Sequence, residues 1–238
     1  MRVALSRLVA SGDVILAARG HYALAAERLE PFAHVRSFRT GFAARCAWTG
    51  GFVGVLTAEL PRRNQALVRR RERALALAGL REFRHALAVR PDNLEGGVAA
   101  VAAHLARLGL DDEAEVIGVT LDARQVRAVE ALYDVQADTA SAVALESKVR
   151  ALLGRIGTRS KRKDAAETFF VGDEVLRFLA RDPLLPESMA DPAPRRALAT
   201  AMEILDERGH ALWASLLDEL EDAQRRTRWR RSGMSQPT

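Results

Sequence analysis

Cysteine is almost absent from this sequence, with Cys46 the one example in 238 residues. Neither a disulfide framework nor a zinc cluster built on cysteines can therefore form within the chain. Histidine is sparse too, and its 5 copies lie without the short spacings that metal ligands show. The sequence predicts no metal site and no bound cofactor.

Aromatic residues are also few. They make up 5% of the chain, against 48% for hydrophobic residues as a whole, so the cores must be built mainly from Leu, Val and Ala. Ala, Leu and Arg are strong helix formers, and the composition therefore favours helices. No apolar run approaches the ~20 residues that span a membrane, and Arg7 interrupts the apolar stretch where a secretion signal would lie. We expect a cytoplasmic protein with no membrane partner.

Acidic residues are outnumbered, 31 against 36 Lys and Arg, which gives a net charge of +5 at pH 7. Arginine supplies most of the positive charge, and its guanidinium group binds phosphate in a bidentate way. This balance admits nucleic acid as a partner. A GC-rich genome would produce the same arginine bias, so composition alone does not decide the question.

The first 25 residues show the pattern of the second half of a winged helix. Residues 1–10 have apolar side chains at helical spacing, and alternating runs at 14–16 and 22–24 flank the turn signal Arg19-Gly20. Polar side chains on the other face of the helix and at the turn are placed to contact DNA; they are Arg2, Ser6, Arg7, Arg19 and His21. The alternatives are an ordinary solvated helix face and a plain exposed turn.

Strand and helix patterns alternate from residue 48 to residue 121. Strands are predicted at 52–56, 83–89 and 116–121, and amphipathic helices at 61–78 and 98–108. Pro61 should open the first of these helices and Gly79 should end it. This order fits a small ferredoxin-like α/β sandwich with one strand unrecognised.

The rest of the chain reads as helical. A basic loop at 157–163 precedes a helix at 169–180, and two more helices are predicted at 194–208 and 211–226. We therefore predict an α+β protein: a partial winged helix at 1–25, a linker helix at 26–47, a central ferredoxin-like domain at 48–121, a C-terminal helical domain at 122–226 and a basic disordered tail at 227–238.

Motifs of the common enzyme classes are missing. The sequence has no glycine-rich phosphate loop, no nucleophile elbow and no histidine-glutamate zinc helix. A metal-dependent nuclease with a similar central sandwich would need an aspartate after its first strand, and the segment from Gly54 to Glu59 contains none. We expect a protein that is not an enzyme, and the nuclease stays a disfavoured alternative.

Three segments resemble the PaaX family of transcriptional regulators. Arg2-Val3-Ala4-Leu5-Ser6-Arg7-Leu8-Val9 is similar to the family's recognition helix, and Val89-Arg90-Pro91-Asp92-Asn93-Leu94 to the end of a strand in its central domain. Phe178-Leu179-Ala180-Arg181-Asp182-Pro183-Leu184-Leu185-Pro186 resembles its C-terminal Asp-Pro-x-Leu-Pro signature. The family usually has two further helices before the recognition helix, so an incomplete winged helix is expected here. A tryptophan-proline-glycine segment of the family is replaced by Ser188-Met189-Ala190-Asp191-Pro192.

The resemblance implies a homodimeric repressor of an aromatic or acyl-CoA catabolic operon. Such a repressor binds double-stranded operator DNA and leaves it when a coenzyme A thioester, such as phenylacetyl-CoA, binds. The thioester needs arginines beside an apolar slot, and the candidates for this effector site are Arg36, Arg39, Arg45, Trp48 and Arg90. The alternative is a ligand-sensing, dimerising protein that does not bind DNA.

Two groups of residues also have plainer interpretations. For Arg90 and Asp92 we rank a strand-end salt bridge or turn cap ahead of a ligand contact. The arginines of the helix at 61–78 are expected to be a solvated face, with phosphate contact as the alternative; they are Arg69, Arg70, Arg71 and Arg73.

Overall fold

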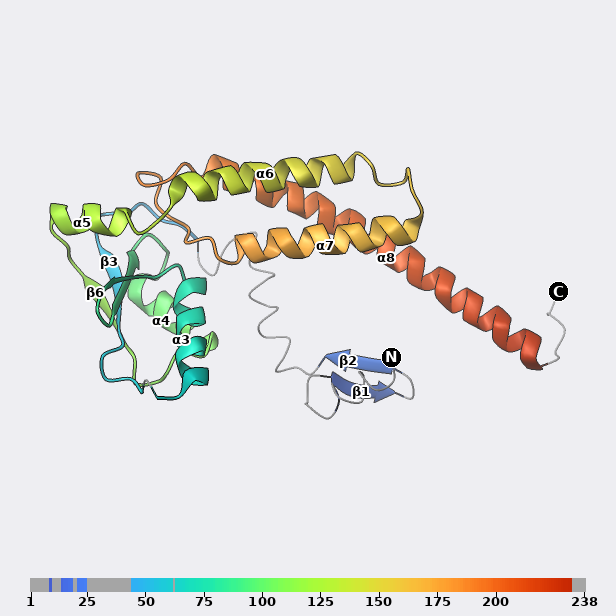
Figure 1. Cartoon of the computed structure of the whole chain (residues 1–238), viewed down its shortest axis with the longest axis horizontal. Coiled ribbons are helices and arrows are strands. Elements are labelled where there is room, and N and C mark those ends of the chain that lie inside the picture. The colour runs from blue at the N-terminus through green and yellow to red at the C-terminus, as the bar shows by residue number, and fades with distance from the viewer. Residues whose placement is uncertain (1–8, 10–13, 19–20, 25–43, 62, 233–238) are drawn as a thin grey trace. The chain divides into compact units, whose positions relative to one another are not determined.

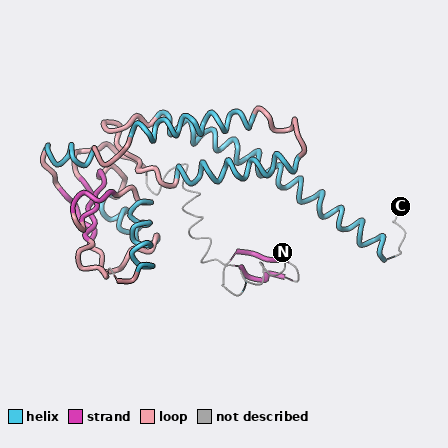
Figure 2. Tube along the Cα trace, viewed as in Figure 1, coloured by secondary structure: helices cyan, strands magenta, loops and turns pink. Residues whose placement is uncertain are grey.

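The computed structural model describes residues 9, 14–18, 21–24, 44–61 and 63–232. It is an α+β protein in two compact units (Figure 1). Unit 1 comprises Met1–Tyr133 and Ala180–Ala190, and unit 2 comprises Asp134–Leu179 and Asp191–Thr238. The described strands all belong to unit 1, and they are drawn in magenta in Figure 2. Among the described residues no helix has the length and apolar character needed to cross a membrane.

A hairpin lies near the N-terminus. Strands β1 (Val14–Ala18) and β2 (His21–Leu24) pair antiparallel, with Val14 opposite Leu24. The hairpin predicted from the alternating runs is thus confirmed. Its turn at 19–20 lies outside the described residues, and so does the helix predicted at 1–10 except for Val9, which is helical.

The main sheet of unit 1 has four antiparallel strands in the order β4-β5-β3-β6. They are β3 (Phe52–Leu56), β4 (Arg81–Arg84), β5 (Leu87–Pro91) and β6 (Glu115–Val119). Helix α3 (Gln65–Leu77) connects β3 to β4, and α4 (Gly97–Arg107) connects β5 to β6. The short helix α5 (Ala123–Glu130) follows, opened by a capping box between Asp122 and Gln125.

The core of unit 1 joins the sheet to its helices. It contains Val53 and Val55 of β3, Ala74 of α3, and Val101 and Leu105 of α4. Leu184 belongs to the same core, although it comes from the segment 180–190 that returns after two helices of unit 2. Aliphatic residues and alanine dominate this cluster, as the low aromatic content requires.

Three predictions for unit 1 are wrong in detail. The strand predicted at 83–89 is a hairpin of β4 and β5, because Ala86 turns the chain with a φ of 60°. The first helix begins at Gln65 rather than Pro61, because the side chain of Asn64 accepts hydrogen bonds from the first turn and caps it. The linker helix is contradicted at 44–47, where Arg45 forms a β-bridge with Leu94; residues 25–43 lie outside the described chain.

Unit 2 is a bundle of three helices, α6 (Val135–Leu153), α7 (Lys161–Leu179) and α8 (Ala193–Ser232). Its core takes residues from each helix, namely Ala142, Val149, Leu152, Ala165, Val171, Val175, Leu198, Met202 and Leu205. The fully buried carboxylate of Asp164, in the first turn of α7, accepts hydrogen bonds from two residues of the connection after α6, namely from the backbone N–H of Gly157 and from Arg159. The loop predicted at 157–163 therefore ends earlier, since Lys161 already belongs to α7.

Helix α8 is one continuous helix of 40 residues. The two helices predicted at 194–208 and 211–226 are therefore a single element, which continues beyond the ends of α6 and α7 (Figure 1). Gly209 does not interrupt it; the side chain of Thr168 on α7 lies close to this glycine. The disordered tail predicted from residue 227 is contradicted as far as Ser232, and residues 233–238 lie outside the described chain.

Candidate functional site

The residues predicted to bind DNA lie almost entirely outside the described chain. Arg2, Ser6 and Arg7 fall in the range 1–8, and Arg19 falls in the range 19–20. His21 is the first residue of β2, where its backbone lies opposite Ala18. Their role in DNA binding therefore stays a prediction.

The predicted effector residues that are described all lie at one end of the main sheet. Arg36 and Arg39 fall outside the described chain. Arg45 bridges Leu94, which follows β5 by a few residues. The indole N–H of Trp48 donates to the carbonyl of Gly51 at 2.6 Å, and its ring meets that of Phe52 edge to face, with centroids 5.4 Å apart. Trp48 is half-buried at the entry to β3.

Arg90, the last of the effector candidates, is enclosed in unit 1 with 1% of its surface exposed. Its Nη1 donates to the carbonyl of Ala78 at 2.6 Å, and its Nε to that of Pro91 at 3.2 Å. Nη2 donates both to Asn93 Oδ1 at 3.3 Å and to the carbonyl of Pro183 at 3.2 Å. Each guanidinium nitrogen thus has a hydrogen-bond partner within the protein. The side chain of Arg90 therefore stabilises the end of β5.

Two further side chains complete this buried polar cluster. Asn93 Nδ2 donates to the carbonyl of Leu184 at 2.7 Å. The hydroxyl of Tyr133, which follows α5, lies 3.1 Å from the carbonyl oxygen of Gly79 and 3.3 Å from that of Val89. The guanidinium of Arg81 lies over the Tyr133 ring, 5.3 Å from its centroid. We call Arg90, Asn93 and Tyr133 the arginine cluster.

The arginine cluster holds the segment 180–190 against the end of α3. Gly79 has a φ of 77°, and a Cβ built on it would lie 2.8 Å from the Cα of Pro183. Only glycine accommodates both this conformation and this close approach. Leu184 takes a φ of 53°, and its N–H is held by the carboxylate of Asp182 at 2.8 Å. The Asp182-Pro183 turn thus belongs to unit 1 rather than forming a corner between two helices.

Burial shifts the titration of both ionisable members of the cluster. Desolvation lowers the pKa of Arg90 from its ordinary value to about 10, although the attraction of Tyr133, Asp92 and Asp182 opposes this shift. Desolvation also raises the pKa of Tyr133 from 10.0 to about 12. At neutral pH Arg90 is therefore charged and Tyr133 is protonated, which is the state that the hydrogen bonds require. Neither group is tuned to exchange a proton near pH 7.

The four arginines of α3 divide between the interior and the surface. Arg71 is buried, pairs with Asp111 at 2.8 Å and donates to the carbonyl of Pro61 at 3.2 Å. This pairing lowers the pKa of Asp111, chiefly through the hydrogen bond from Arg71. Arg69, Arg70 and Arg73 are exposed. The solvated face expected from the sequence is thus correct for these three and wrong for Arg71.

Several of these residues carried no sequence signal of their role. Tyr133 and Asp111 find their partners 40 or more residues away along the chain, and Asn93 finds Leu184 at a separation of 91. Within the described ranges no group of three or more His, Cys, Asp or Glu side chains is placed to hold a metal ion. The described residues thus offer two features for a functional argument, which are the buried arginine cluster and the exposed arginines of α3.

Comparison with known proteins finds a solved structure with a similar fold. No protein-family model and no curated protein matches the chain. The uncharacterized protein Rv0674 from Mycobacterium tuberculosis is similar in structure, with a TM-score of 0.53 at 20% sequence identity. The match covers 89% of this chain and 83% of that one. This chain therefore shares its fold with a mycobacterial protein over most of its length.

Proposed function

We propose that the chain is a DNA-binding transcriptional regulator similar to the PaaX family, acting as a cytoplasmic homodimeric repressor. The observation that carries the proposal is a contact between two of the segments that resemble the family. Arg90 and Asn93 of one segment hydrogen-bond to Pro183 and Leu184 of the other, 93 and 91 residues further along the chain. Two segments that separately resemble the family are thus in direct contact in the structure.

The arrangement of strands supports the finer architecture that we propose. The main sheet follows the chain order β-α-β-β-α-β, and its spatial order is β4-β5-β3-β6. We take this unit as a ferredoxin-like sandwich, for which this chain order is typical. We take the β1–β2 hairpin as the wing of a winged helix, with residues 1–10 as its recognition helix.

The proposed signal is a coenzyme A thioester such as phenylacetyl-CoA. Because Arg90 is enclosed and bonded within the protein, the proposed effector site rests on Arg36, Arg39, Arg45 and Trp48. Arg90 would support that site indirectly, since it fixes the end of β5, and Arg45 forms a β-bridge with Leu94 just after that end. Isothermal calorimetry with phenylacetyl-CoA tests this part of the proposal. Absence of heat would show that the chain does not bind this thioester. The proposal that the chain binds DNA would still stand.

Substitution of Arg2 tests the DNA-binding role. Arginine in the major groove pairs with guanine, so Arg2→Ala should weaken binding to the DNA upstream of the chain's own gene by about 1–3 kcal/mol. Binding to a shuffled sequence of equal length should change much less. Fluorescence anisotropy titrations of the full chain measure both. The same modest loss on both sequences would mean that Arg2 does not read bases.

A further inference from the structure

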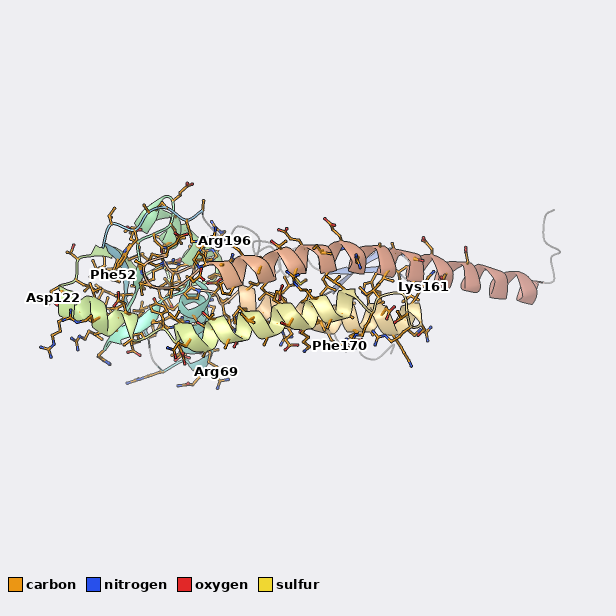
Figure 3. All side chains as sticks on the ribbon, turned by 90° about the horizontal axis from the view of Figure 1, so that it is seen from above. Phe52, Arg69, Asp122, Lys161, Phe170 and Arg196 are labelled. Carbon is orange, nitrogen blue, oxygen red and sulfur yellow. The ribbon has the colours of Figure 1, made fainter. Side chains whose placement is uncertain are left out.

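Helix α3 carries three exposed arginines on its surface. Arg69, Arg70 and Arg73 are exposed, and no ion pair is formed by any of them with another described residue. Figure 3 shows Arg69 at the outer edge of its unit. Their neighbour Arg71 turns inward to Asp111 instead. We call Arg69, Arg70 and Arg73 the α3 arginine surface.

Two exposed arginines on the helices of unit 2 have an acidic partner on the same helix. Arg150 on α6 pairs with Glu146, and Arg177 on α7 pairs with Asp173, each four residues earlier. On α3 the residue four positions before Arg73 is Arg69. Like charges at this spacing destabilise a helix by about 0.2–0.5 kcal/mol. The chain thus bears a repulsion on α3 that it avoids on α6 and α7.

The fold keeps this surface in place. Ala74 of α3 and its C-cap Ala78 are fully buried, which directs Arg69 and Arg73 away from the core, whereas Arg70 lies at the flank of the helix. Gly109 has no side chain, and a Cβ there would lie 3.2 Å from Arg70 Cδ. This glycine therefore leaves room for the stem of Arg70. A polyanion that binds the surface would relieve the repulsion between its arginines.

We propose that the α3 arginine surface binds the phosphate backbone of DNA and does not read its sequence. Guanidinium groups form bidentate, charge-assisted hydrogen bonds with phosphate. Backbone contacts of this kind fix a protein's position on the duplex, while other residues read the bases. The inference rests on the proposed function and extends it, since it adds a second DNA contact outside the predicted winged helix.

A double substitution measures the contribution of this surface. Arg69→Ala/Arg73→Ala in the full chain should weaken binding to the upstream DNA and to its shuffled counterpart by the same factor. Each lost phosphate contact lowers the slope of log K against log salt by about 0.9, so the slope should fall by about 2. Arg69→Lys/Arg73→Lys should retain the slope, because lysine keeps the charge.

The matched control is Arg150→Ala/Arg177→Ala, which removes two exposed positive charges from unit 2. It should leave the affinity and the slope close to those of the natural chain, and circular dichroism should show equal helix content in all variants. An unchanged slope in Arg69→Ala/Arg73→Ala would overturn the inference. An equal loss in the control would also overturn it, because net charge rather than this surface would then be responsible.

The same titrations separate this inference from the proposed function. If the natural chain prefers the upstream DNA while the α3 substitutions have no effect, the inference fails and the regulator stands. If binding shows no sequence preference but still depends on Arg69 and Arg73, the proposed function fails and the inference stands. Unchanged DNA binding combined with lost binding of coenzyme A would assign the surface to the coenzyme's phosphates and overturn the inference.

Discussion

At the scale of single residues, the arginine cluster shows how a buried charge is made tolerable. Burial of a charged group is costly unless the group is paired and hydrogen-bonded. Arg90 meets this requirement with four hydrogen bonds and with the nearby carboxylates of Asp92 and Asp182. Its partners belong to three separate stretches of the chain, so one side chain holds together the ends of α3, β5 and the segment 180–190.

Tyr133 gives this cluster a measurable pH dependence. Its pKa is about 12 in the folded protein against 10.0 for the unperturbed group. Between pH 10 and 12 the unfolded chain therefore loses this proton first, so the contribution of Tyr133 alone to the free energy of unfolding falls by about 2–3 kcal/mol. Arg90 acts in the opposite sense, because its pKa is lowered to about 10 and the unfolded chain holds that proton longer.

The substitution Tyr133→Phe separates the two contributions. Near pH 8 it should destabilise the protein by about 0.5–1.5 kcal/mol, since a hydrogen bond is lost. As the pH rises from 10 to 12, the natural chain loses the stabilisation from Tyr133 and the variant does not. The difference between them, measured by urea denaturation, should therefore shrink and then change sign. A difference that stays constant over this range would mean that Tyr133 titrates normally and is not enclosed.

At the scale of elements, the end of α3 depends on Gly79. Gly79→Ala would place a Cβ 2.8 Å from a backbone atom of Pro183 and would also strain a φ of 77°. Gly50 is the matched control in the same unit, because its φ is 92° and nothing lies within 4 Å of the added Cβ. Gly50→Ala should cost about 1–2 kcal/mol from strain alone, and Gly79→Ala should cost more. Equal losses in urea denaturation would show that Pro183 does not pack against Gly79.

Helix α8 carries a second prediction at this scale. Glycine within a helix is destabilising by about 0.5–1 kcal/mol relative to alanine. A Cβ on Gly209 would meet Thr168 at 3.7 Å, an ordinary contact. Gly209→Ala should therefore raise the thermal midpoint of unfolding, as followed by the helical circular dichroism signal. A lower midpoint would favour two helices joined by a turn at this glycine.

At the scale of the whole molecule, the sequence predicted elements better than their connections. Periodicity located β3, α4 and β6 to within a few residues, because their apolar spacing is local information. The alternation from Phe83 to Val89 passes through a turn at Ala86, which has no glycine to signal it, so two strands were read as one. Gly209 gave the opposite error, since a glycine within a helix resembles a stop.

The site was harder to predict than the fold for a related reason. The sequence analysis singled out Arg90, but its role depends on the backbone carbonyl groups of Ala78 and Pro183. Every residue has such a carbonyl group, so the residue types at these positions do not reveal the contact. The return of the segment 180–190 to the first unit is also invisible in local patterns. From the sequence we expected Arg90 to form a strand-end salt bridge or a turn cap. The structure instead shows a buried cluster, because the partners of Arg90 come from distant parts of the chain.

Selection from a random DNA library tests the central proposal most directly. The full chain is mixed with random-sequence duplexes, and the bound fraction is sequenced after several rounds. A specific regulator should enrich one common motif, and a homodimer should give it two related halves in inverted order, about 10 base pairs or a multiple apart. A bound fraction with the same base sequence statistics as the starting library would contradict the proposal. Sequence-independent attraction between arginines and phosphates would then account for all the binding.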